Sequence, residues 1–162
     1  MSSQSELMAS FLELSVALTG FSEFHLQGTG QAEQYYATVE QNISSDLLVE
    51  LLKTFQTLKL KAKSAHDDSV LTTGLRSEIL GSEKLGAIAR NIIKLWYVAT
   101  WYPLPASWQA AFGTENSQQH PYIVAPQAYP EGLVWSAIGV NPPGAKAPGF
   151  GTWSEPPSVS LS

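Results

Sequence analysis

The first hundred residues place apolar side chains at the three- and four-residue spacing of amphipathic helices. The pattern is clearest over residues 7–18, 47–58 and 85–99, and each segment predicts a helix with one face in a core. Gly20 is placed to end the first of them in a left-handed conformation. Residues 85–99 carry the strongest stripe, so we expect them to form the central helix of a small bundle.

Two other segments show a weaker helical pattern. Residues 31–41 are polar apart from two tyrosines and a valine, and residues 70–80 have a sparse apolar pattern. A helix is expected in each. The lysine-rich residues 59–68 are expected to fray the helix that precedes them.

Serine residues mark where several of these helices should begin. Ser3 followed by Glu6 forms a capping box, in which each side chain bonds the other residue's backbone amide. Ser44 or Ser45 can cap the next core helix, and Ser82 the strongest one.

The pattern changes in the last third of the chain. Eight of the ten prolines and five glycines lie in residues 121–157, so regular structure there should be short, except for a helical stretch around residues 127–138. This region keeps Trp135, Phe150 and Trp153, whereas disordered segments are poor in aromatic residues. A stiff aromatic tail is suited to docking.

The predicted fold class is therefore mainly α. We expect a small helical bundle over residues 1–120 and an extended C-terminal tail, rich in proline, glycine and aromatic residues, over residues 121–162. The tail would dock on the bundle, on a partner subunit or on both, within a single domain.

Composition favours a covered surface and excludes one class of partner. Charged residues make up 14% of the chain, well below the usual share of about a quarter, although it has five Trp, six Tyr and six Phe. Such a chain is expected to bury some aromatic surface against a partner. Residues 1–50 hold seven acids and no Lys or Arg, and the net charge of −5 excludes nucleic acid as a partner.

The sequence offers no recognisable catalytic constellation. Without cysteine the chain has no disulfide, thiolate metal site, iron–sulfur ligand or covalent haem attachment. His25, His66 and His120 lack the spacing that places two metal ligands on one helix face. The glycines from Gly28 lead to Glu33, whose carboxylate would repel a pyrophosphate. We expect no catalytic, cofactor-binding or metal-binding residue here.

An aromatic cluster ends the strongest helix. Trp96, Tyr97, Trp101 and Tyr102 can anchor the tail in the core, or they can face a partner, since Trp and Tyr are enriched at interface hot spots. Both interpretations stay open at this point.

Three regions of the chain together carry a resemblance to a known family. Residues 11–20 read FLELSVALTG, residues 92–97 read IIKLWY, and the closing region combines YPEGLVW (residues 129–135) with APGFGTWSEP (residues 147–156). These resemble the opening, central-helix and closing motifs of the small subunit of membrane-associated, FAD-dependent sorbitol, glucose and related sugar dehydrogenases. The matches run in order along nearly the whole chain.

The resemblance implies a division of labour. In such complexes a large subunit of the glucose–methanol–choline type holds FAD and oxidises the sugar, and a cytochrome c subunit can take the electrons onward. The small subunit supports folding, flavin loading, stability or export of the large one, and it performs no chemistry itself. The implied cofactor is FAD in the partner, with none in this chain.

Two departures from the family pattern bear on attachment and location. The family commonly carries a twin-arginine leader and a cysteine in its closing segment, and this sequence has neither. Docking is therefore expected to be noncovalent. The resemblance implies a periplasmic or membrane-associated complex; a full-length chain without a signal would instead be cytoplasmic. No run reaches the roughly 18 apolar residues that span a bilayer, so direct membrane insertion is not expected.

The sequence thus predicts a non-catalytic small subunit, with two alternatives. One is a stand-alone enzyme acting on a sugar or polyol through His66, Asp67 or Asp68, and the other is a homo-oligomeric structural protein. The residues expected to serve as structural and interface anchors share a large aromatic ring; they are Trp96, Tyr97, Trp101, Tyr129, Trp135, Phe150 and Trp153.

Overall fold

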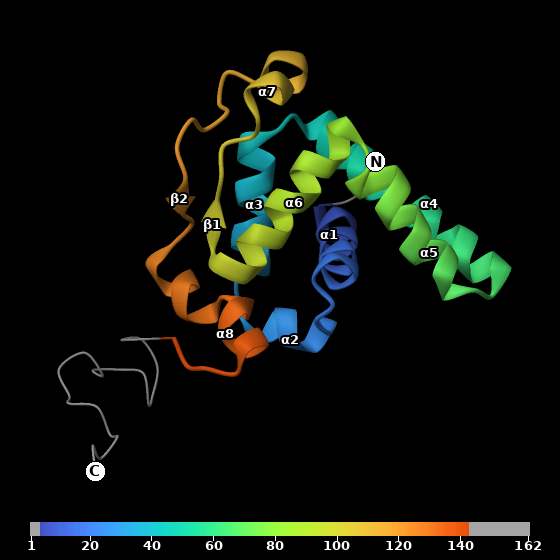
Figure 1. Ribbon diagram of the computed structural model, residues 1–162, viewed down its shortest axis with the longest axis horizontal. Helices are drawn as coiled ribbons and strands as arrows, with labels where there is room; N and C mark the ends of the chain where they lie inside the picture. The colour runs from blue at the N-terminus through green and yellow to red at the C-terminus, as the bar shows by residue number, and fades with distance from the viewer. Residues whose placement is uncertain (1–3, 143–162) are drawn as a thin grey trace, which may run out of the picture.

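The computed structural model describes residues 4–142, and this part of the chain is mainly helical, as predicted (Figure 1). Its α-helices are α1 (Gln4–Thr19), α2 (Glu23–Gly28), α3 (Ala32–Asn42), α4 (Ser45–Ala65), α5 (Asp68–Gly74), α6 (Glu83–Val98), α7 (Ala106–Phe112) and α8 (Leu133–Ile138). A π-helix, η1 (Leu75–Leu80), continues α5, and a 3₁₀-helix, η2 (Pro126–Glu131), precedes α8.

Helix α6 lies at the centre of the bundle, with α1, α3, α7, α8 and η1 packed around it (Figure 1). Ile88, Ile92 and Leu95 on its seam are fully buried, in line with the apolar stripe in the sequence. Phe11 and Leu14 of α1 are also fully buried and belong to the same core. The three strongest periodic segments therefore form the core, because each buries one continuous face.

The predicted helix boundaries hold at several ends. The side chains of Ser44 and Ser82 accept hydrogen bonds from the backbone amides of Leu47 and Leu85, so both serines are N-caps. Gly20 has a φ of +77° and follows α1 directly. The capping box at Ser3 lies outside the described residues.

The expected fraying between residues 59 and 68 is wrong. Helix α4 continues without a break to Ala65, because Leu58 and Ala62 still face the core, and it ends where His66 adopts a left-handed φ of 53°. The weak helix expected over residues 70–80 is present as α5 and η1. Residues 23–28 and 106–112 form two short helices that were not predicted from the sequence.

The described part of the tail packs on the bundle. Strand β1 (Thr100–Trp101) pairs antiparallel with β2 (Tyr122–Ile123), with Thr100 opposite Ile123. Ala125, Ala128 and Leu133 then enter the same hydrophobic core as α1 and α6. Beyond these residues, Phe150 and Trp153 lie outside the described part of the chain.

The helical stretch expected around residues 127–138 is divided into two short elements. Gly132 separates the 3₁₀-helix η2 from α8. A Cβ at this position would lie 2.7 Å from the carbonyl oxygen of Tyr97, so the chain can cross the end of α6 this closely only with glycine. Within residues 4–142, every helix is too short or too polar to cross a membrane.

Candidate functional site

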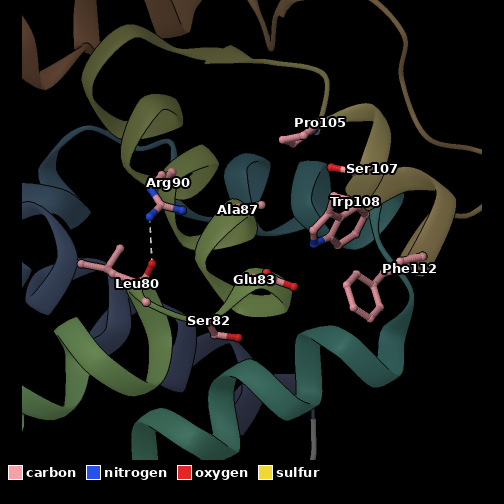
Figure 2. A pocket seen from close by; sticks show the side chains of 11 residues that line it. Leu80, Ser82, Glu83, Ala87, Arg90, Pro105, Ser107, Trp108 and Phe112 are labelled. Atoms are coloured by element: carbon pink, nitrogen blue, oxygen red, sulfur yellow. Dashed lines mark hydrogen bonds between the residues drawn. The ribbon is translucent and has the colours of Figure 1, made fainter.

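One groove, of about 530 Å³, lies between the start of α6 and α7 (Figure 2). Trp108 and Phe112 of α7 form one wall, and Leu80 and Arg90 lie on the other side. The groove combines aromatic, hydroxyl and charged side chains, so it is the first place to look for a binding or catalytic site.

The polar groups around this groove hold the fold together. The Arg90 guanidinium donates to the carbonyl oxygen of Leu80 at 2.8 Å, which satisfies the end of η1 (Figure 2). Ser82 caps α6, and the indole N–H of Trp108 donates to the carbonyl oxygen of Lys84 at 2.8 Å. Because these groups already have structural partners, the groove is better explained as a junction between helices than as a reaction site.

The three histidines belong to different parts of the structure. His25 belongs to α2, His66 ends α4, and His120 follows α7 in the loop that leads to β2. Among residues 4–142, no group of three or more histidines and carboxylates is placed to hold a metal ion.

Of the three residues suggested for a stand-alone enzyme, His66 and Asp67 are helix caps and Asp68 is the first residue of α5. The Asp67 carboxylate accepts a hydrogen bond from the amide of Ser69 at 2.9 Å and caps α5. Hydrogen bonds from Ser69, from its side chain and then its backbone, hold the pKa of Asp67 below its ordinary value. His66 occupies the C-cap of α4 next to it. An exposed helical turn of this kind explains both residues without catalysis.

The aromatic residues expected at an interface fall into two groups. Trp96 and Trp101 are each 1% exposed, so they are core anchors. Tyr97 is half-buried, and its hydroxyl donates to the carbonyl oxygen of Thr19 at 3.0 Å. Tyr129 and Trp135 are also half-buried; their rings meet edge to face, with centroids 5.5 Å apart, and the Trp135 indole N–H donates to the carbonyl oxygen of Tyr129.

Several strongly exposed apolar side chains were not anticipated from the sequence. Phe24 is 88% exposed, Ile138 is 62% exposed and Val140 is 49% exposed. Phe24 belongs to the short helix α2, and the other two lie at the end of α8. In the sequence, Phe24 could be noticed only as an apolar residue between Glu23 and His25. The segment around it is too short to show helical periodicity.

Helices α2 and α8 lie near each other at one end of the molecule (Figure 1), and Phe24 and Val140 line the same groove there. A groove of about 340 Å³ there is lined by residues from both helices, including Phe24, His25, Trp135 and Val140. Pro142, the last described residue, lines the same groove. We call the surface formed by Phe24, Trp135, Ile138 and Val140 the α2–α8 surface.

Comparison with protein-family models, with curated proteins and with solved structures found no match.

Proposed function

We propose that this chain is a non-catalytic small subunit of a flavin-dependent sugar or polyol dehydrogenase complex. Its partner is a large subunit of the glucose–methanol–choline type that holds FAD. The observation that carries this proposal is the α2–α8 surface, where Phe24, Ile138 and Val140 are all at least 49% exposed. Strongly exposed apolar side chains of this kind are typical of a surface that a partner covers.

The character of the surface favours a protein partner. Its exposed side chains are aromatic or branched aliphatic, and the half-buried ring of Trp135 stands beside them. Aromatic residues surrounded by a polar rim are typical of interface hot spots, where a few buried side chains contribute most of the affinity. Helix α2 forms one wall of the groove. Phe21, just before this helix, anchors it, because its ring packs on Tyr97 and on His25.

The three segments that carry the family resemblance meet in the fold. Residues 11–20, 92–97 and 129–135 are far apart in the sequence, but they lie in α1, α6 and the η2–α8 region, which contact one another through α6. Tyr97 links all three, because its hydroxyl bonds Thr19 and its carbonyl oxygen lies against Gly132. The three segments therefore pack together at the end of the molecule that carries the α2–α8 surface.

The finer parts of the proposal come from the resemblance alone. The complex would be periplasmic or membrane-associated, a cytochrome c subunit would accept its electrons, and this chain would support folding, flavin loading or export of the large subunit. The surface described above supplies the docking site that each of these roles needs.

The experiment that tests the function is co-expression. A glucose–methanol–choline-type dehydrogenase from the same genome is produced with and without this chain, and dye-linked sugar oxidation is measured in both preparations. We expect activity and bound flavin to fall at least about tenfold when the chain is omitted. Equal activity and flavin content without the chain would refute the proposal.

A further inference from the structure

A second groove, of about 460 Å³, lies along α1 on another face of α2. Its floor is apolar and is formed by Met8 and Leu12 of α1 together with Ala32 at the start of α3. We call it the α1–α3 groove. Met8 is half-buried, and its flexible thioether side chain can adapt to a ligand of varied shape.

Three carboxylates stand around this apolar floor. Glu13 comes from α1, Glu23 from α2 and Glu33 from α3. Glu13 pairs with Lys59 at 2.7 Å, so its charge is partly balanced, whereas Glu23 and Glu33 are exposed. The first 52 residues contain no Lys or Arg, so α1, α2 and α3 contribute none, and the nearby lysine, Lys59, belongs to α4.

The groove has the shape and charge of a helix-binding site. Residues on α1 line it at positions 5, 8, 9, 12 and 13, one stripe of the helix. At about 1.5 Å per residue this stripe is about 12 Å long, the length of about two helical turns. An apolar floor with an acidic rim is complementary to a helix that has one apolar face edged by lysine or arginine.

We propose that the α1–α3 groove binds a basic amphipathic helix of another protein. The apolar face of that helix packs on Met8 and Leu12, and its cations lie beside Glu23 and Glu33. This proposal does not depend on the flavin dehydrogenase. Glu23 and Gln27 line the α1–α3 groove, whereas Phe24 and His25 line the groove at the α2–α8 surface. Helix α2 therefore presents different side chains to the two sites.

A labelled model helix provides the probe. The peptide is an amphipathic helix of about 18 residues made of leucine and lysine, and its binding to the full chain is followed by fluorescence anisotropy. We expect one peptide per chain, with an affinity that falls as salt rises. The double variant Glu23→Gln/Glu33→Gln should weaken binding at least about fivefold, and Met8→Gln should weaken it about as much.

The matched control removes the same charge from another groove. Glu40 and Glu115 line a groove near the start of α4, and Glu40→Gln/Glu115→Gln should change the affinity less than about twofold. The proposal is overturned if both double variants weaken binding equally, if a leucine–glutamate peptide binds as tightly, or if the peptide does not bind at all. Self-association of the chain that Glu23→Gln/Glu33→Gln abolishes would also overturn it, because a second copy would then be the occupant.

Discussion

At the scale of single residues, Tyr35 shows how burial sets chemistry in this core. Its side chain is 1% exposed, its ring meets Trp96 edge to face at 4.9 Å, and its hydroxyl lacks a hydrogen-bond partner among the described residues. Burial raises the pKa of Tyr35 well above its ordinary value, and the Glu131 carboxylate raises it further.

This shift predicts a loss of stability in alkali. The folded state holds the Tyr35 proton more tightly than the unfolded state does. The resulting contribution to the free energy of unfolding is complete below the unfolded pKa of about 10. It is lost as pH rises above that value, by up to about 1.4 kcal/mol per pH unit. Denaturant unfolding between about pH 9 and pH 12 measures this slope. Tyr35→Phe should flatten it, and Tyr102→Phe should not. Identical slopes for native protein and Tyr35→Phe would contradict this explanation.

Gly86 is a second residue whose role follows from close contact. A Cβ at this position would lie 2.5 Å from the carbonyl oxygen of Leu80 and 3.2 Å from that of Ile79. Helix α6 can therefore cross the end of η1 only with glycine there. We expect Gly86→Ala to lower the free energy of unfolding by about 1–3 kcal/mol. Gly28→Ala, where a Cβ would meet open space, is the control, and equal losses for both would be evidence against this contact.

At the scale of elements, the helices and caps that depend on local sequence patterns could be predicted from the sequence. The helices α1 and α6 and the first part of α4 follow from apolar spacing, and the N-caps Ser44 and Ser82 follow from capping chemistry. Helix α4 was expected to fray because its last turns are lysine-rich, but Ala62 is buried there, a tertiary contact that the local pattern does not reveal.

The short elements were beyond sequence reasoning for a related reason. Helices α2 and α7 have six and seven residues, too few to display a period of 3.6 residues. Packing on the rest of the bundle stabilises them, as when the Trp108 indole of α7 bonds Lys84 of α6. The α2–α8 surface was missed because one of its walls is such a helix. Trp135, which was expected to be an anchor in the tail, lines the groove there, and its indole N–H donates to the carbonyl oxygen of Tyr129.

Capping gives a prediction at this scale. Ser82 begins α6, the central helix, and accepts from the Leu85 amide at 3.1 Å. Ser82→Ala should lower the free energy of unfolding by about 1 kcal/mol, because that amide would lose its side-chain partner. Ser107→Ala, at an exposed position in the first turn of α7, is the comparison in thermal unfolding. If the two variants melt at the same temperature, the cap contributes nothing measurable.

At the scale of the whole molecule, the structure combines a well-packed core with two exposed grooves beside α2. The core contains the central aromatic residues, including Trp96 and Trp101, whereas the α2–α8 surface carries exposed apolar side chains such as Phe24. A chain with few charges can remain folded with such a surface, but covering it by a partner would be favourable. In the proposed complex, this surface would let the chain contribute contact rather than chemistry.

The measurement that tests this account most directly is the flavin that co-purifies with the tagged chain after co-expression with the dehydrogenase. Absorbance at about 450 nm reports FAD in the partner. We expect about one flavin per chain for the native protein and at least a tenfold loss for Phe24→Ser/Ile138→Ser, with helical circular dichroism unchanged. A colourless native preparation would contradict the subunit assignment, and full flavin in the double variant would contradict docking at the α2–α8 surface.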